Sequence, residues 1–203
     1  MKYIVKGNEP VELTKRKSQL NTNRRKLGRK KIKDIIRRAL MNEQGHICCY
    51  CERRIVEGDC HIEHFRPQSD GVDPLDYSNM LCSCLDQIEE RIPRHCGYLK
   101  GDWFDEDLLI SPLNKDCENH FSFTADGQIL PKYGDKAADE TIKRLGLNIP
   151  KLQDMRKQVI SPFIDENLTD DDYIRFVNGY LKMDSEGRFN PFFTTIRYLF
   201  VER

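Results

Sequence analysis

The spacing of apolar positions predicts helices in both end regions of the chain. In "KKIKDIIRRAL" apolar residues recur at every third or fourth position, which is typical of one helix face, and the pattern ends near Gly45. After Lys132 the same spacing returns in "KAADETIKRLGL" and "IPKLQDMRKQVISPF". A further helix is expected in "TDDDYIRFVNGYL", where Thr169 can cap the first turn.

The middle of the chain follows a different pattern. Between Ile47 and Pro131, Cys, His, Gly and Pro interrupt short apolar runs, which favours short strands, turns and small helices. "SDGVDPLDYSN" predicts a turn-rich loop, and "FSFTADGQILP" predicts a hairpin that turns at Asp126 and Gly127. We therefore expect an α+β protein in three parts: a basic N-terminal arm and helix (1–46), a core (47–131) and a helical C-terminal region (132–203).

Positive charge is concentrated in the N-terminal arm. The formal net charge is zero, but residues 1–40 hold 14 Lys and Arg against three acids, a local charge of +11. Such density suits a polyphosphate, because each neutralised phosphate releases condensed counterions. A solvated helix face or a docking strip for an acidic partner would explain the charge equally well. The candidate nucleic-acid contacts in this arm are Arg24, Arg25, Lys30 and Lys31.

Eight cysteines occur in a chain that shows no signal peptide and no apolar run of membrane-spanning length. Without a secretory route, clustered cysteines are metal ligands more often than disulfides. We therefore expect a cytoplasmic protein that does not contact a membrane.

Four of the cysteines are candidates for one zinc site. Cys48 and Cys51 form a C-x-x-C knuckle, whose tight turn lets two thiolates reach one tetrahedral ion. We expect Cys84 and Cys96 to supply the second pair, since each lies in a short stretch with polar neighbours. Four thiolates leave no open position on zinc, so this ion would be structural and catalysis would need a separate centre.

The other four cysteines leave alternatives open. Cys49 and Cys82 lie one or two positions from the chosen ligands and could replace them. Cys60 and Cys117 are expected to be buried free thiols.

Four motifs follow one another in order: "CCYC", "EHFRP", "YSNMLCSC" and "HCGYLKGD". This succession resembles that of the zinc-bearing HNH endonucleases: a cysteine pair, an acid and a histidine before a proline, an asparagine, and two cysteines before Lys-Gly. The resemblance implies the ββα-metal fold, here a zinc-clamped core surrounded by helices. It also implies hydrolysis of phosphodiester bonds in nucleic acid.

Two further stretches, "MKYIVKGNEP" and "GDWFDEDLLISPLNKDCENHFSFTADGQILP", resemble the HNH subunit of Septu anti-phage systems, some of which are associated with retrons. In that family the subunit works with an ABC-type ATPase. The resemblance covers roughly the first two-thirds of the chain. It implies an effector of antiviral defence that acts in a complex with such an ATPase.

The expected chemistry centres on "HIEHFRPQS". Hydrolysis needs an activated water, and a neutral imidazole suits that task, so His64 is the candidate general base. One Mg²⁺ or Mn²⁺ can neutralise the phosphate and assist the leaving oxygen, and Glu63 is the best protein ligand for it. By resemblance, Asn79 holds the loop of the histidine. Arg66 and Lys100 could meet backbone phosphates.

The chain departs from the family pattern in its third element. That element usually supplies His or Asn just after the last zinc cysteine, but here Gly97 follows Cys96. The candidates for the second ligand of the catalytic ion are therefore His95 and Asp102.

A second departure concerns the strand that carries the acid and the histidine. Adjacent strand residues point to opposite faces, so Glu63 and His64 cannot both enter the site from a regular strand. We therefore expect a twist or bulge near Phe65. If Glu63 is turned away, His61 is the first alternative ligand.

Two functions fit these observations. The first is a metal-dependent endonuclease, for which we favour DNA over structured RNA as the substrate. The second is a catalytically silent zinc module that uses the basic arm to bind nucleic acid or a partner protein. The two differ in whether His64 acts in catalysis.

Overall fold

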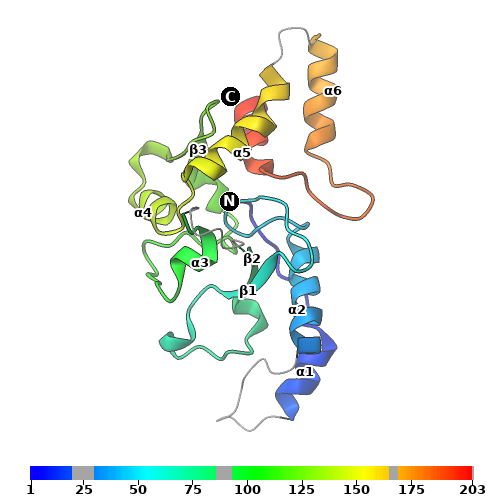
Figure 1. The fold of residues 1–203 in the computed structure, drawn as a ribbon, viewed down its shortest axis with the longest axis vertical. Helices are drawn as coiled ribbons and strands as arrows, with labels where there is room; N and C mark the ends of the chain where they lie inside the picture. The colour runs from blue at the N-terminus through cyan, green and yellow to red at the C-terminus, as the bar shows by residue number, and fades with distance from the viewer. Residues whose placement is uncertain (20–29, 86–92, 165–168, 203) are drawn as a thin grey trace.

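A strand pair and one short helix form the centre of the chain. The computed structural model describes residues 1–19, 30–85, 93–164 and 169–202. Strand β1 (Cys60–His64) pairs antiparallel with β2 (Met80–Cys84), and α3 (Cys96–Lys100) packs against β2 (Figure 1). This strand, strand, helix order confirms the α+β fold expected from the motifs, with four cysteines clustered beside it.

The pairing of β1 with β2 is regular along its whole length. The register runs from Cys60 opposite Cys84 to His64 opposite Met80. Phe65 continues the pattern, because its N–H donates to the carbonyl of Asn79 at 3.0 Å. The expectation of a bulge near Phe65 is therefore wrong.

Two helices come from the N-terminal arm: α2 (Lys30–Glu43) lies beside the strand pair, and α1 (Val11–Ser18) packs on α2. Helix α2 confirms the expected helix and packs its apolar face against both strands, with Ile36 and Leu40 fully buried. Just beyond its end, the Gln44 amide donates to the carbonyls of Ile47 and Cys82 at 2.9 and 2.8 Å. These bonds fix the helix, the cysteine knuckle and β2 to one another.

The C-terminal half is mainly helical. The expected hairpin is confirmed, since β3 (Phe121–Phe123) and β4 (Ile129–Pro131) pair around a turn at Gly127, whose φ is +87°. The expected cap is also confirmed, because the Thr169 side chain accepts from the N–H of Asp172. The helices of this region are α4 (Lys136–Arg144), α5 (Pro150–Ile160), α6 (Asp170–Tyr180) and α7 (Phe193–Phe200).

Short 3-10 turns connect the longer elements of the chain. They are η2 (Gln68–Asp70), η3 (Tyr77–Asn79), η4 (Cys117–His120), η5 (Lys132–Gly134) and η6 (Ser161–Ile164). The loop predicted for "SDGVDPLDYSN" is confirmed, because it holds η2 and η3 between the two central strands. Figure 1 shows that this loop extends away from the strand pair, on the side opposite α5 and α6.

The C-terminal region is joined to the cysteine knuckle by buried polar contacts. The carboxylate of Glu52, only 2% exposed, accepts from the N–H of Thr194 in α7 at 2.8 Å. The carbonyl of Glu52 accepts from the N–H of Phe192 at 3.0 Å. Across the described ranges, no helix is both long enough and apolar enough to cross a membrane.

Candidate metal centre and active-site cleft

Four cysteine sulfurs gather at the end of the strand pair. The Sγ atoms of Cys48, Cys51, Cys84 and Cys96 all lie within 4.8 Å of one another, and all four residues are buried. A tetrahedral zinc with Zn–S bonds of about 2.3 Å places its sulfurs about 3.8 Å apart. The sulfurs of Cys51 and Cys84 are 3.9 Å apart, so the set fits a four-thiolate zinc site.

The knuckle that brings two of these sulfurs together is a tight hairpin. The N–H of Cys48 donates to the carbonyl of Arg53 at 2.9 Å, and the N–H of Glu52 donates back to the carbonyl of Cys48 at 3.1 Å. Glu52 has a φ of +63°, the left-handed conformation that closes the turn. The other cysteines, Cys49, Cys60, Cys82 and Cys117, are buried free thiols outside the group of four.

Positively charged and polar side chains surround the sulfur cluster. Burial alone would lower the pKa of Arg53, but the neighbouring sulfur of Cys84 raises it. Arg156 of α5 is fully enclosed, and burial lowers its pKa to about 10 even though the sulfurs of Cys51 and Cys96 act in the opposite direction. Two arginines thus lie where they can balance the negative charge of a zinc tetrathiolate.

His95 belongs to this cluster. It is completely buried, and its Nε2 lies 3.5 Å from the Sγ of Cys84. It does not line the cleft described next. The expectation that His95 is a ligand of a separate catalytic ion is therefore wrong, because its ring faces the thiolates.

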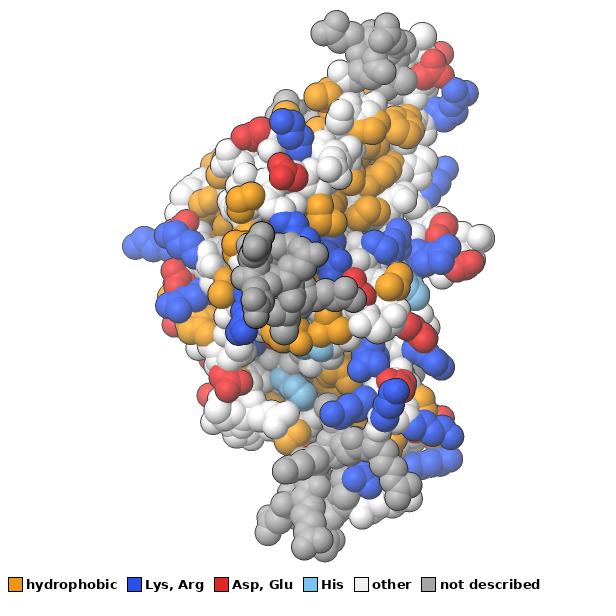
Figure 2. Space-filling view, viewed as in Figure 1, with side chains coloured by type: hydrophobic (Ala, Val, Ile, Leu, Met, Phe, Trp, Pro, Cys, Tyr) orange, Lys and Arg blue, Asp and Glu red, His pale blue; other side chains and the backbone are white. Residues whose placement is uncertain are grey.

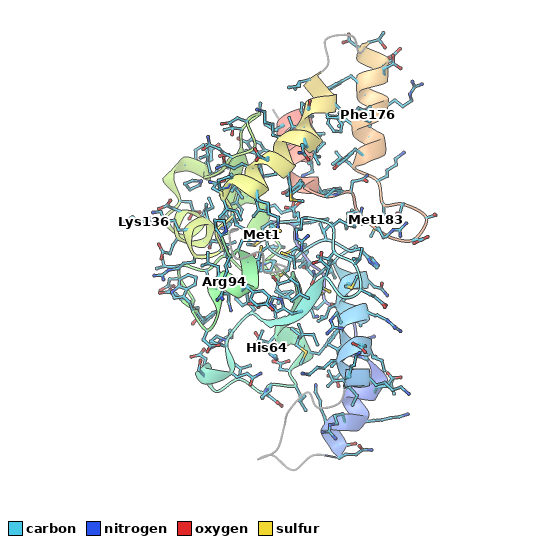
Figure 3. All side chains as sticks on the ribbon, viewed as in Figure 1. Met1, His64, Arg94, Lys136, Phe176 and Met183 are labelled. Carbon is cyan, nitrogen blue, oxygen red and sulfur yellow. The ribbon has the colours of Figure 1, made fainter. Side chains whose placement is uncertain are left out.

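A cleft of about 590 Å³ opens beside the sulfur cluster, around the end of β1. Its walls come from β1, the loop after it and α3. Its lining includes His61, Glu63, His64, Pro67, Gly97 and Asp102. Figure 3 shows His64 below α3, on the stretch that leads from β1 into the loop, and Figure 2 shows histidine side chains reaching the surface of this face.

Glu63 is a buried carboxylate held by three neighbours. Its Oε1 lies 2.9 Å from the Nζ of Lys100 and accepts from the hydroxyl of Tyr50 at 3.1 Å. Its Oε2 lies 3.2 Å from the Nε2 of His61. Burial by itself would raise the pKa of Glu63, but the bond from His61 and the charge of Lys100 outweigh it and lower the pKa. Glu63 is therefore an anion at neutral pH, as a ligand for a cation must be.

The ring of His64 is oriented by a contact to a backbone carbonyl. Its Nε2 lies 3.0 Å from the carbonyl oxygen of Pro74, and because a carbonyl can only accept, Nε2 carries the proton. The other ring nitrogen, Nδ1, is then unprotonated in the neutral ring. His64 therefore presents a basic nitrogen from a ring that is fixed at its opposite side.

Both Glu63 and His64 reach the cleft without a bulge. The cleft is formed around the strand end, so that its lining includes Ile62 and His64 from one side of β1 and His61 and Glu63 from the other. His64 is the last residue of the strand, and the loop that follows it supplies the rest of the wall. Access from both sides of the strand makes the expected distortion unnecessary.

Asn79 fastens the loop that follows His64. Its Oδ1 accepts from the N–H of Arg66, and its Nδ2 donates to the carbonyl of Arg66, both at 2.9 Å. The side chain is only 8% exposed. These two bonds fix the backbone two residues beyond the histidine.

The residues expected to bind phosphate differ in how exposed they are to solvent. Lys100 is buried and paired with Glu63, so its expected role as a phosphate contact is not supported by its position. The Arg66 side chain is half exposed, with its Nη2 3.0 Å from Asp70. Lys30 and Lys31 are exposed at the start of α2, in a region where Figure 2 shows Lys and Arg gathered over α1 and α2. Arg24 and Arg25 lie outside the described residues.

Sequence reasoning missed three contributors to the site. Tyr50 holds Glu63, and the Oγ of Ser83 accepts from the N–H of Gly97 at 3.1 Å. His61 was considered only as a substitute for Glu63, whereas the two lie side by side. The spacing of two between His61 and Glu63 could have predicted this contact, because residues i and i+2 of a strand share a face. No comparable signal identifies Tyr50 or Ser83.

The comparison with known proteins agrees with this geometry. No protein-family model matches the chain. The chain is 37% identical over 143 residues to the protein proposed as the HNH endonuclease of retron Vc95 in Vibrio cholerae serotype O1 biovar El Tor. The match covers 66% of this chain and 67% of that relative. With the strand, strand, helix core and its four clustered cysteines, this identity shows that the chain belongs to the HNH endonuclease family and is a nuclease.

Proposed function

We propose that this nuclease hydrolyses phosphodiester bonds of DNA in the cleft at the end of β1, with His64 as the general base. The observation that carries the proposal is the fixed ring of His64. Its Nε2 is bound to the Pro74 carbonyl, which leaves Nδ1 as the only ring atom able to take a proton. Nδ1 is therefore the atom assigned to accept the proton of the attacking water.

Glu63 is the proposed protein ligand for a catalytic Mg²⁺ or Mn²⁺. It is ionised, it lines the cleft, and Tyr50 and Lys100 hold its Oε1. When bound, such an ion supplies charge neutralisation at the phosphate and assistance to the departing oxygen. Asp102 also lines the cleft and stays a candidate second ligand.

Lys100 and Asn79 act as positioning residues in this proposal. Besides its pairing with Glu63, the Lys100 ammonium donates to the carbonyl of His64 at 3.2 Å. Asn79 fixes the next turn of backbone through Arg66. The base and the carboxylate are thereby held at a constant separation while the substrate binds.

The four-thiolate zinc is assigned a structural role. Its ligands come from the knuckle, β2 and the start of α3, so the ion would join these three segments, of which α3 lines the cleft. No open coordination position is left for a substrate. Metal-binding energy in such a clamp contributes directly to folding.

DNA is the substrate that we favour over structured RNA. Exposed basic residues of α1 and α2 suit the closely spaced phosphates of either nucleic acid, so cleavage assays must distinguish the two. Such contacts position a backbone and carry no sequence information. Any preference for a particular cutting site would therefore depend on features other than the basic residues of α1 and α2.

We further propose that the nuclease is the effector of an anti-phage defence complex with an ABC-type ATPase. The relative is named as a retron protein, which supports this proposal, and the stretches noted in the sequence resemble Septu HNH subunits. A nuclease that cut without restraint would damage its own cell, so control by a partner is expected. The proposed location is the cytoplasm.

The sequence alone also leaves open a catalytically silent zinc module. It would use the same zinc and the same basic helices to bind nucleic acid or a partner, with His64 as an ordinary histidine. The experiment is to purify the chain with and without its proposed ATPase partner and to incubate each with plasmid and structured RNA in Mg²⁺ or Mn²⁺. Cleavage that requires His64 supports the nuclease, and absence of cleavage under all of these conditions supports the silent module.

A further inference from the structure

The helix of the metal-binding core lacks a side chain where it faces β1. Gly97 follows the last zinc cysteine, and its N–H is held by the Oγ of Ser83 at 3.1 Å. A Cβ built on Gly97 would lie 2.4 Å from the Oε2 of Glu63 and 2.7 Å from the Nε2 of His61. Both distances are too short for any side chain, so the space is already taken by atoms from the strand.

The two atoms that fill this space form a possible chelating pair. His61 and Glu63 project from the same face of β1, and their Nε2 and Oε2 atoms are 3.2 Å apart at the wall of the cleft. That separation is within the range of two cis ligands on one cation, because metal to ligand distances of about 2.1 Å at a right angle give about 3.0 Å.

We propose that His61 and Glu63 together hold the catalytic divalent cation, with His61 supplying from β1 the ligand that α3 lacks at Gly97. This inference rests on the proposed nuclease function of the cleft. Both protein ligands would then come from β1, instead of one from β1 and one from α3.

The neighbours of Glu63 leave one oxygen for a cation. Oε1 is engaged by Lys100 and Tyr50 on the buried side, whereas Oε2 contacts His61. Oε2 is therefore the oxygen left to bind a cation together with His61 at the wall of the cleft. Lys100 also neutralises the charge of Glu63, so the protein alone attracts a cation only weakly.

The contacts of His61 do not indicate a purely structural histidine. Its Nε2 contacts Glu63, its Nδ1 is buried and has no hydrogen-bond partner among the described residues, and its ring packs edge to face on Tyr98 with the ring centroids 5.0 Å apart. The side chain is 27% exposed at the wall of the cleft. These contacts place Nε2 beside Glu63, and Nδ1 would carry the ring proton if Nε2 bound a cation.

The ligand types indicate the class of cation. A carboxylate and an imidazole suit Mn²⁺ and later first-row metals better than Mg²⁺, which prefers oxygen ligands. Two protein ligands leave the remaining positions to water and to phosphate oxygens of the substrate. Binding without nucleic acid is therefore expected to be measurable for Mn²⁺ and much weaker for Mg²⁺.

The test measures the binding of Mn²⁺ to the zinc-loaded full chain. Binding is monitored by electron paramagnetic resonance, as the loss of the signal of free Mn²⁺. We expect His61→Ala and Glu63→Gln each to weaken Mn²⁺ binding by at least about tenfold, which is the smallest effect expected on removing a ligand. His61→Gln provides a second variant, because its amide can keep a hydrogen bond to Glu63 while the imidazole is lost. His120→Asn is the matched control, since His120 does not line the cleft and Asn can retain the contact to Asp135.

Unchanged Mn²⁺ affinity in folded His61→Ala and His61→Gln proteins would overturn the inference. If Asp102→Asn alone weakened binding, that residue would be the second ligand instead. The binding measurement does not depend on cleavage, which separates the two hypotheses. A chain that binds Mn²⁺ through His61 but cuts no nucleic acid contradicts the proposed function only, whereas a cutting enzyme that binds Mn²⁺ without His61 contradicts this inference only.

Discussion

Replacement of Lys100 by Met gives the most informative test of the site's electrostatics. The Lys100 side chain is 1% exposed and Glu63 7%, and their charged atoms are 2.9 Å apart. At an effective dielectric constant of about 20, two unit charges at this distance attract by roughly 6 kcal/mol, which burial of both ions largely offsets. Removing one partner leaves a buried charge, and the expected loss of unfolding free energy is about 3 to 5 kcal/mol.

The assay is urea denaturation of the zinc-loaded protein, followed by circular dichroism, with zinc content measured for each variant. The double variant Lys100→Met/Glu63→Gln should be more stable than Lys100→Met alone by at least about 2 kcal/mol, because the unpaired anion is no longer present. Met keeps most of the side-chain volume, which limits any effect of a cavity.

The reasoning would be refuted if Lys100→Met lost less than about 1 kcal/mol of unfolding free energy, the value typical of an exposed pair. A fall in nucleic-acid affinity with unchanged stability would instead restore Lys100 as a phosphate contact. The structure predicts that Lys100→Met lowers the unfolding free energy more than it lowers the affinity for nucleic acid.

Three further predictions concern the zinc, the loop clamp and the basic helix. Cys51→Ser should abolish zinc binding and unfold the core, as measured by elemental analysis and circular dichroism; a well-folded protein without zinc would contradict this. Asn79→Ala should lower the unfolding free energy by about 1 to 3 kcal/mol, because the backbone of Arg66 loses two buried partners, and it should slow cleavage at constant zinc content. Lys30→Glu/Lys31→Glu should weaken DNA binding and reduce the slope of log affinity against log salt by about two, and an unchanged slope would exclude these lysines from the interface.

Much of the fold could be predicted because the sequence pattern and the packing agree. Helix α2 follows its apolar spacing, and the β3–β4 hairpin turns at Gly127 as its turn residues require. The cysteine assignments depended on the order of motifs and on local spacing. The choice of Cys84 over Cys82 matches the structure, but the strand pattern alone could not have made it, because both residues lie on the same face of β2 and differ only in their position along the strand.

The details of the cleft could not be predicted because they depend on distances between elements. The burial of Lys100 against Glu63 follows from the packing of α3 on the strand pair, which no local pattern encodes. His95 resembled a candidate ligand in sequence, but its ring faces Cys84. The cleft's access to both sides of β1 likewise follows from where the strand ends.

Arg156 shows how far the zinc cluster extends into the fold. It lies about a hundred residues after the knuckle in sequence, yet the sulfurs of Cys51 and Cys96 affect its pKa. Its guanidinium donates to the carbonyl of Gly127 at 2.7 Å, so the β3–β4 hairpin is held beside the same charge. The helical C-terminal region therefore contributes to the surroundings of the metal centre.

His64 is proposed to activate the water that cleaves DNA in the cleft at the end of β1. The direct measurement is cleavage of supercoiled plasmid by the wild type and by His64→Ala, each zinc-loaded, in Mn²⁺ and in complex with the proposed ATPase partner. We predict nicked and linear DNA from the wild type and intact plasmid from His64→Ala at equal zinc content and equal stability. Equal cleavage by the two proteins would contradict the assignment of His64 as the general base.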